Sequence, residues 1–253
     1  MKSDGLRARI LAGEVLTGTF IKTPAYEVIE VLAMSGLDFV CIDGEHAPND
    51  RRGMDACLAM AKALGLPALV RVPEGTPAQI LMALDSGAVG VVVPHVFTVE
   101  RARIAARAAH FGHGGRGFAG STRWAGGGRL TIAEVLAMDD ESAVLVQIEE
   151  PEGVEAAAEI AAIEGVDGLF VGPADMAVCL GKTSIDDPAV REVMASVAGA
   201  AKTAGKAAVT FVASTATVPE LRALGISMFF VASEHSFMLA AARQVVADMR
   251  APR

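Results

Sequence analysis

Two apolar segments each end in an acidic residue, and these acids are the first sign of chemistry in the sequence. Ala143-Val-Leu-Val-Gln-Ile-Glu149 and Gly168-Leu-Phe-Val-Gly-Pro-Ala-Asp175 both have the pattern of a buried parallel strand that delivers a carboxylate to the end of a sheet. A helix cap is the competing interpretation of such an acid. Glu149 is a poor cap, and Gln147, two residues earlier on the same face of the strand, favours a site instead. The two acids could therefore share one metal ion.

Strand-like and helix-like segments alternate along the chain and decide where these acids lie. The expected strands are 17–21, 39–43, 68–72, 90–94, 143–149, 168–171, 207–212 and 227–232. The expected helices are 6–12, 25–34, 53–64, 77–84, 99–110, 132–138, 153–163, 188–204, 218–224 and 237–249. Eight such units predict an α/β fold, a parallel (β/α)8 TIM barrel, and 253 residues suit one domain over 1–253. A doubly wound sheet is the alternative, but the glycine-rich segment 112–128 lacks a nucleotide-binding fingerprint.

The composition narrows the class of partner. A net charge of −8 without clustered Lys and Arg argues against nucleic acid. The sequence has no leader-like apolar segment and no apolar run of about 18 residues, so we expect a soluble cytoplasmic protein with no membrane partner. Cys41, Cys57 and Cys179 lie far apart, which predicts reduced thiols and neither a disulfide framework nor a zinc ribbon.

In a (β/α)8 barrel the catalytic residues come from the C-terminal ends of the strands. The polar residues expected there are Lys22, Thr23, Asp43-Gly-Glu-His46, Arg71, His95, Gln147, Glu149, Asp175, Ser214, Thr215 and Ser233-Glu-His235. Some have plain alternatives, since Asp43 could turn the chain at Asp-Gly and His46 could be an ordinary surface histidine. Arg71 is harder to explain structurally, because a long cation beside a core needs an anion, which could be Glu149, Asp175 or a substrate carboxylate. The roles of His95 and His235 stay open.

The segment Gly172-Pro-Ala-Asp175 offers a second binding feature, a possible anion site. If a helix begins at Pro173, the free N–H groups of Ala174 and Asp175 point at the strand end and make a seat for a small anion. Two carboxylates, this helix start and Arg71 together describe a site for a 2-oxo acid, whose oxo and carboxylate oxygens would chelate the ion. With no histidine or cysteine among the proposed ligands, Mg²⁺ or Mn²⁺ is expected, with Co²⁺ as a further option.

Six motifs follow one another in a specific order along the chain. They are Ile42-Asp-Gly-Glu-His-Ala-Pro48, Val70-Arg71, Val93-Pro94, Gly115-Arg-Gly117, Val146-Gln-Ile-Glu149 and Val166-Asp-Gly-Leu-Phe-Val-Gly-Pro-Ala-Asp175. Over essentially its whole length the chain resembles the HpcH/HpaI family of class II, metal-dependent pyruvate aldolases. The resemblance implies a barrel of the phosphoenolpyruvate/pyruvate type, usually a homohexamer with its last helix exchanged between protomers.

The resemblance also implies the reaction and the site. The reaction is cleavage or formation of 4-hydroxy-2-oxo acids from pyruvate or hydroxypyruvate and an aldehyde. The implied roles are metal ligand for Glu149 and Asp175, site lining for Gln147, oxo-acid binding for Arg71, and acid/base catalysis for His46 paired with Asp43 or Asp85. Two segments depart from common members, Val93-Pro-His95 and 121–128. Both lie where an acceptor could be contacted, so the sequence does not name the aldehyde.

Three other functions compete with this one. A coenzyme A ester lyase of the citrate-lyase-like branch would want extra basic residues for the nucleotide, and the acidic chain has no obvious cluster. A non-catalytic barrel that holds an oxo acid as an effector is the second alternative. A Schiff-base aldolase needs a buried lysine on a strand, and Lys22 is the only lysine near a strand end.

Overall fold

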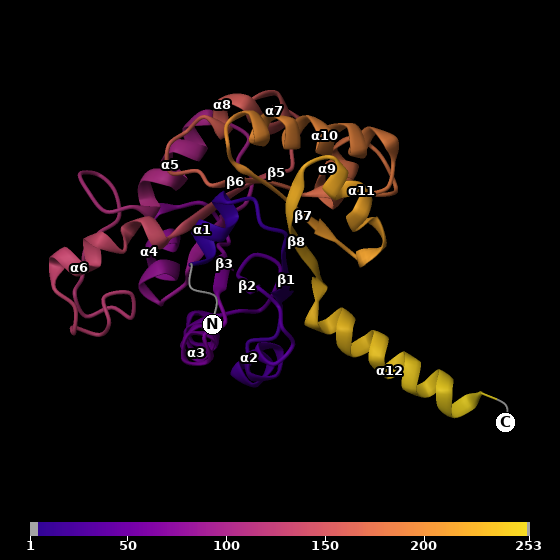
Figure 1. The fold of residues 1–253 in the computed structure, drawn as a ribbon, viewed down its shortest axis with the longest axis horizontal. Helices are drawn as coiled ribbons and strands as arrows, with labels where there is room; N and C mark the ends of the chain where they lie inside the picture. The colour runs from indigo at the N-terminus through magenta and orange to yellow at the C-terminus, as the bar shows by residue number, and fades with distance from the viewer. Residues whose placement is uncertain (1–4, 252–253) are drawn as a thin grey trace.

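Eight parallel strands close into a barrel in sequence order, which confirms the predicted (β/α)8 architecture (Figure 1). The computed structural model describes residues 5–251. The strands are β1 (Leu16–Ile21), β2 (Phe39–Asp43), β3 (Ala68–Arg71), β4 (Gly90–Val93), β5 (Ala143–Ile148), β6 (Gly168–Val171), β7 (Ala207–Val212) and β8 (Ile226–Ser233). Each strand lies within one or two residues of its expected position.

The helices lie outside the strands and follow the predicted order with three differences. They are α1 (Leu6–Leu11), α2 (Tyr26–Ala33), α3 (Arg51–Leu64), α4 (Pro77–Asp85), α5 (Val99–Ala109), α6 (Ile132–Ala137), α7 (Pro151–Glu155), α8 (Ala157–Ala161), α9 (Pro173–Cys179), α10 (Pro188–Thr203), α11 (Val218–Ala223) and α12 (Glu234–Arg250). The helix expected over 153–163 is two short helices, α7 and α8. A helix does begin at Pro173, and α12 starts three residues earlier than expected. Within residues 5–251, no helix is long and apolar enough to cross a membrane.

The alternation of side chains along each strand builds the inside of the barrel. Leu69, Cys41 and Leu145 belong to one apolar cluster that fills the interior. Two residues further along, the same faces carry Arg71, Asp43 and Gln147 in turn, and these are buried too. Polar residues therefore form the layer directly above the apolar filling, at the C-terminal end of the barrel.

Glycine makes room for this filling at one interior position of β1. A Cβ on Gly18 would lie 2.3 Å from the ring of Phe39, which is fully buried. Phe39 in turn packs edge-on against Phe230 with ring centroids 4.8 Å apart. A side chain at position 18 would displace this aromatic layer, so the barrel requires glycine there.

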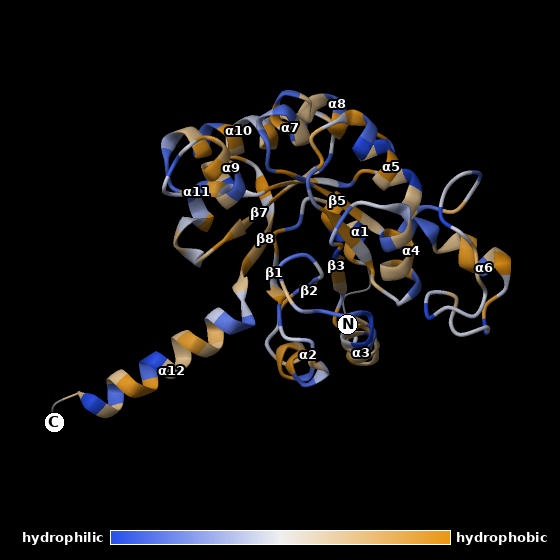
Figure 2. Ribbon diagram, turned by 180° about the vertical axis from the view of Figure 1, so that it is seen from behind, coloured by the Kyte–Doolittle hydropathy of each residue, from blue (hydrophilic) through white to orange (hydrophobic). Residues whose placement is uncertain are grey.

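The N-terminal end of the barrel is closed by α1, whose Leu6 and Ile10 join the interior cluster. The last helix, α12, instead stands away from the barrel in both views (Figures 1 and 2). Its first residue, Glu234, is buried and accepts the backbone N–H groups of Lys22 and Thr23, which fixes the start of the helix beside β1. The rest of α12 is exposed, including Leu239 and Val246.

Candidate active site

A cavity of about 450 Å³ opens at the C-terminal end of the barrel. Its lining contains the predicted catalytic His46 and all six predicted substrate-binding residues, namely Arg71, Gln147, Gly172, Pro173, Ala174 and Asp175. Phe20, Phe170 and Phe211 supply an apolar wall. The volume and the mixture of an apolar wall with a few polar groups are typical of a small-molecule site.

Arg71 is held rigidly by Asp43, its neighbour on the adjoining strand. The two residues are register partners of β2 and β3, and the guanidinium donates from Nε to Oδ1 at 2.9 Å and from Nη2 to Oδ2 at 2.7 Å. Burial disfavours the charged carboxylate of Asp43, but Arg71 outweighs this effect and lowers its pKa. The guanidinium also lies over the ring of Phe20, 4.5 Å from its centroid. Asp43 is therefore the anion that the sequence required for Arg71, instead of Glu149 or Asp175.

Glu149 and Asp175 approach one another across Gly172. A Cβ on Gly172 would lie 2.9 Å from Glu149 Oε2 and 3.5 Å from Asp175 Oδ2, so glycine leaves open the space that both carboxylates face. Burial raises the pKa of Glu149; His95 opposes the rise, and the charges of Asp175 and Glu45 add to it. A buried carboxylate near two other acids is stabilised by a cation.

Gln147 lies beside this space on β5. Its Nε2 donates to Glu149 Oε2 at 2.5 Å, and its buried Oε1 has no hydrogen-bond partner within residues 5–251. The expectation that Gln147 and Glu149 point the same way agrees with this contact. An orphaned oxygen, two facing carboxylates and the glycine gap fit a hard divalent cation with bound solvent or substrate oxygens.

His46 reaches the cavity, but the structure does not pair its ring with either predicted aspartate. Its backbone N–H donates to Asp43 Oδ1 at 3.1 Å, whereas the half-exposed imidazole lies 3.8 Å from Glu45. Asp85 ends α4 and pairs with Arg116 at 2.6 Å. Because α4 leads back to the start of β4, Asp85 lies at the opposite end of the barrel from His46 in the same chain.

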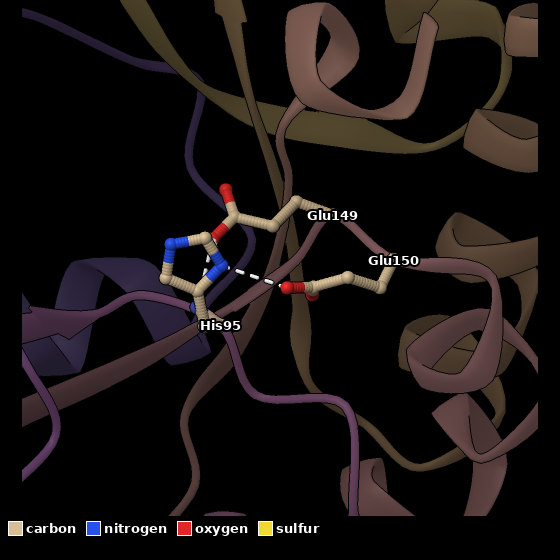
Figure 3. Close-up of side chains that lie close together, drawn as sticks. All are labelled: His95, Glu149 and Glu150. Carbon is tan, nitrogen blue, oxygen red and sulfur yellow. Dashed lines mark hydrogen bonds and ion pairs between the residues drawn. The ribbon is translucent and has the colours of Figure 1, made fainter. Parts of the chain in front are cut away.

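Three residues near Glu149 were not assigned a role from the sequence. His95 Nδ1 lies 2.7 Å from Glu150 Oε1 and 3.1 Å from Glu149 Oε1 (Figure 3). Its Nε2 lies 3.3 Å from Glu45 Oε1. Burial disfavours the charged imidazole, but these carboxylates outweigh it and raise the pKa of His95. The sequence signal for this cluster was the pair of adjacent acids, Glu149 and Glu150. Consecutive side chains of an extended segment point to opposite sides, so one of the two acids had to face a neighbouring loop.

Lys22 also lines the cavity, where its Nζ lies 3.4 Å from Asp43 Oδ2. Together, the barrel, the facing carboxylates and the fixed arginine have the features expected of a barrel enzyme with a small anionic substrate and a cation. This class of site is consistent with what the comparisons with known proteins find.

The family model "HpcH/HpaI aldolase/citrate lyase" matches residues 16–241, and the chain belongs to that family. A hydroxypyruvate/pyruvate aldolase of Roseovarius nubinhibens is 33% identical over 250 residues, covering 98% of this chain and 97% of that protein. A 2-keto-3-deoxy-L-rhamnonate aldolase of Escherichia coli K12 is 33% identical over 214 residues, 81% of this chain and 78% of that protein.

The fold is shared with solved structures of the family. An HpcH/HpaI aldolase/citrate lyase family protein from Burkholderia cenocepacia J2315 superposes with a TM-score of 0.91 at 37% identity, covering 97% of this chain and 99% of that one. The chain is an enzyme, an aldolase of the metal-dependent class, as the sequence predicted.

Proposed function

We propose that this aldolase cleaves and forms 4-hydroxy-2-oxo acids, with pyruvate or hydroxypyruvate as the donor and an aldehyde as the acceptor. The observation that carries the proposal is that Arg71 and Asp175 line one cavity, with Glu149 Oε2 facing the gap at Gly172, which lines the same cavity. The names of the aldolase relatives support the choice of donor. The cavity of about 450 Å³ has room for a short oxo acid and a small aldehyde.

Glu149 and Asp175 would hold the divalent ion, which we assign as Mg²⁺, Mn²⁺ or Co²⁺. When bound, such an ion supplies Lewis-acid polarisation of the C2 carbonyl oxygen of the oxo acid. Gln147 Oε1, orphaned in the cavity wall, would accept a hydrogen bond from a hydroxyl or water in the same space. Gly172, Pro173 and Ala174 would border the carboxylate of the substrate at the start of α9.

Arg71 would bind the oxo acid through the N–H groups that Asp43 does not use. The bidentate pair with Asp43 leaves the guanidinium in one orientation before substrate arrives, which is the preorganisation that stabilises developing charge best. As the C3–C4 bond breaks, its electron pair moves to C3 and is delocalised toward the C2 oxygen. A fixed cation at that oxygen lowers the barrier to this step.

His46 would move the proton. During cleavage its imidazole takes the proton of the C4 hydroxyl, the C4 carbon becomes the carbonyl carbon of the aldehyde, and a proton is delivered to C3 to give the methyl group of pyruvate. Asp43 would orient His46 through its backbone N–H. Asp85, which pairs with Arg116 within the chain, would serve His46 only across a contact between subunits.

We also propose a homo-oligomer, a hexamer by family resemblance, in which protomers exchange α12. The exposed apolar residues of this helix support the proposal, among them Phe237, Leu239, Val245 and Val246. An apolar helix face that stands away from its own barrel (Figure 2) would be covered by a second copy. Light scattering coupled to size-exclusion chromatography tests it: we expect a single species heavier than a monomer, and a monomer would contradict the exchange.

Metal-dependent enolisation tests the proposed function most directly. Pyruvate is incubated in D₂O with enzyme treated with EDTA and with enzyme resupplied with Mn²⁺ or Mg²⁺, and deuterium uptake at the methyl group is followed by NMR. We expect uptake only with the ion, and loss of uptake in Glu149→Gln. A binding protein without catalysis would show no uptake under any condition, and uptake that ignores the chelator would contradict the metal assignment. A panel of aldehydes offered with pyruvate and hydroxypyruvate then identifies donor and acceptor.

A further inference from the structure

One imidazole beside the proposed site is surrounded by carboxylates at the spacing of metal ligands. His95 Nδ1 lies 2.7 Å from Glu150 Oε1 and 3.1 Å from Glu149 Oε1, and the three ligand atoms lie within 4.8 Å of one another (Figure 3). Nitrogen and oxygen ligands about 2.1 Å from an ion and at right angles are roughly 3.0 Å apart. The contacts of His95 therefore have the separations of neighbouring ligands on one cation.

The far side of the ring supports the same interpretation. His95 Nε2 lies 3.3 Å from Glu45 Oε1, and Glu45 is fixed in turn by Arg71 Nη1 at 3.3 Å. Metal-binding histidines commonly donate the other ring N–H to a carboxylate, which sets the tautomer. Glu45 therefore lies where such a partner would orient the ring. A cation bound by His95, Glu149 and Glu150 would take the place of the hydrogen that Nδ1 and Glu150 Oε1 share.

The backbone holds His95 in place from both sides. The residue adopts a left-handed conformation with φ of 54°. Its N–H donates to Glu149 Oε1 at 2.7 Å, and its carbonyl accepts from Arg101 Nη1 at 2.7 Å. These bonds place the ring without any metal present, so an ion would meet a preformed set of ligands.

This cluster is separate from the space between Glu149 and Asp175. The second oxygen of Glu149, Oε2, faces Gln147 and Gly172, whereas Oε1 faces His95. His95 and Glu150 line a different cavity of about 700 Å³, formed with the loops 73–77 and 93–97. That cavity can supply the water molecules that complete a coordination shell.

The charge around Glu149 also favours more than one cation. Five carboxylates gather here, those of Asp43, Glu45, Glu149, Glu150 and Asp175. The arginine and lysine that face them within residues 5–251 are Arg71 and Lys22; both lie against Asp43, and Arg71 also reaches Glu45. With these two groups and a single divalent ion, an anionic oxo acid would leave two of the six negative charges uncompensated.

We propose that His95, Glu149 and Glu150 form a second cation site, with Glu149 shared between this ion and the one at Asp175. A nitrogen ligand with two carboxylates suits Mn²⁺, Co²⁺ or Zn²⁺ better than Mg²⁺, which prefers oxygen ligands alone. The proposal rests on the proposed function through the shared Glu149, whereas His95 and Glu150 lie outside the substrate cavity.

The test is metal stoichiometry, measured on metal-free protein by equilibrium dialysis against Mn²⁺ or Mg²⁺ followed by elemental analysis. We expect two Mn²⁺ but one Mg²⁺ per chain. Glu150→Gln and His95→Gln should each weaken one Mn²⁺ by about tenfold or more and leave the other in place. Asp175→Asn should weaken only the other ion. Glu152→Gln, at an exposed acid of α7, is the matched control and should change neither.

The outcomes separate the two sites. One Mn²⁺ per chain that is lost in Asp175→Asn but unaffected by Glu150→Gln overturns the proposal and makes the His95 cluster an ion pair only. One Mn²⁺ that is lost in Glu150→Gln and unaffected in Asp175→Asn supports it, and contradicts the metal ligands of the proposed function instead. Visible absorption of the Co²⁺ protein adds a direct readout, since removing the nitrogen ligand in His95→Gln should shift the d–d bands while circular dichroism shows the fold unchanged.

Discussion

Buried charges at the two ends of the barrel are partnered very differently. At the N-terminal end, Arg9 pairs with Glu14 at 2.9 Å and with Asp38 at 2.6 Å. Asp167 accepts the backbone N–H of Val144 at 2.9 Å and Arg7 Nε at 3.0 Å. Each of these ions has an opposite charge and a hydrogen bond within the chain. Such a set stabilises the position of α1 under the barrel and needs no ligand.

At the C-terminal end, acids outnumber bases. Arg71 pairs with Asp43, but no arginine or lysine within residues 5–251 pairs with the buried Glu149, whose ion-pair contact is with His95. The contrast points to the buried charges that serve function, which are those without an opposite permanent charge among residues 5–251. In the proposed function, ions and substrate complete this end, whereas the buried charges of the opposite end are already paired.

The largest effect is expected when the arginine of each end is removed. Arg71→Ala should lower kcat/KM for aldol cleavage by about a thousandfold and abolish pyruvate proton exchange. Arg9→Ala should instead lower the free energy of unfolding, by roughly 2–3 kcal/mol, because it removes the hydrogen bonds of a buried guanidinium to Glu14 and Asp38. Its folded fraction should keep normal activity. Arg71→Lys keeps the positive charge but not the bidentate hydrogen bonds. This variant is the control that distinguishes a loss of activity caused by misfolding from one caused by the missing guanidinium.

Equal activity losses in Arg71→Ala and Arg9→Ala, measured on the folded fractions, would contradict the division of the barrel into a structural and a functional end. Denaturant unfolding followed by fluorescence gives the stabilities. Steady-state cleavage of a 4-hydroxy-2-oxo acid gives the rates.

The next effect concerns the proton at the C-terminal end. His46→Gln should reduce kcat by about 10²–10⁴-fold, because general acid–base catalysis contributes this much. His113→Gln changes an exposed histidine in the loop after α5 and should leave kcat unaltered. Should His46→Gln keep full activity, the role passes to His235, whose Nε2 lies 2.8 Å from Thr23 Oγ1.

A third pair of variants compares buried carboxylates directly. Asp167→Ala leaves the N–H of Val144 unpaired and should destabilise the protein by roughly 3 kcal/mol, with kcat unchanged. Glu149→Gln should instead stabilise the metal-free protein, by about 1 kcal/mol, because it removes a buried charge that Asp175 and Glu45 repel. Unfolding in EDTA measures both. A large loss of stability in Glu149→Gln would show that the carboxylate is structural.

The barrel could be predicted from the sequence because its rules are local. Alternating apolar strands and helices fix the order of the elements, and the period of two along a strand places Asp43, Arg71 and Gln147 inside. The same rules bring Glu149 and Asp175 to one end of neighbouring strands. What they do not give is which polar groups meet, because the register of neighbouring strands and the loops between them set those contacts.

The pairing of Arg71 shows this limit. The sequence offered Glu149, Asp175 or a substrate as its anion, whereas strand register places Asp43 opposite it. His95 and Glu150 follow different strands, and their contact depends on a left-handed residue that no local pattern signals. The sequence also gives no sign that the helix expected over 153–163 is interrupted, because no proline or glycine stands at the junction at Ala156.

The smallest effect is the acid dependence of the Asp43–Arg71 pair. Its lowered pKa means that Asp43 holds fewer protons in the folded than in the unfolded chain, where a carboxyl titrates near about 3.9. The stabilisation is therefore complete above that pH and is lost as pH falls through the folded pKa. Unfolding free energies of the wild type and of Asp43→Asn, both in EDTA, should differ most at neutral pH and converge in acid. A difference that grows as the pH falls would contradict the lowered pKa of Asp43. A difference that stays constant would mean that the Asp43–Arg71 pair stabilises the fold through hydrogen-bond geometry and not through the charge of Asp43.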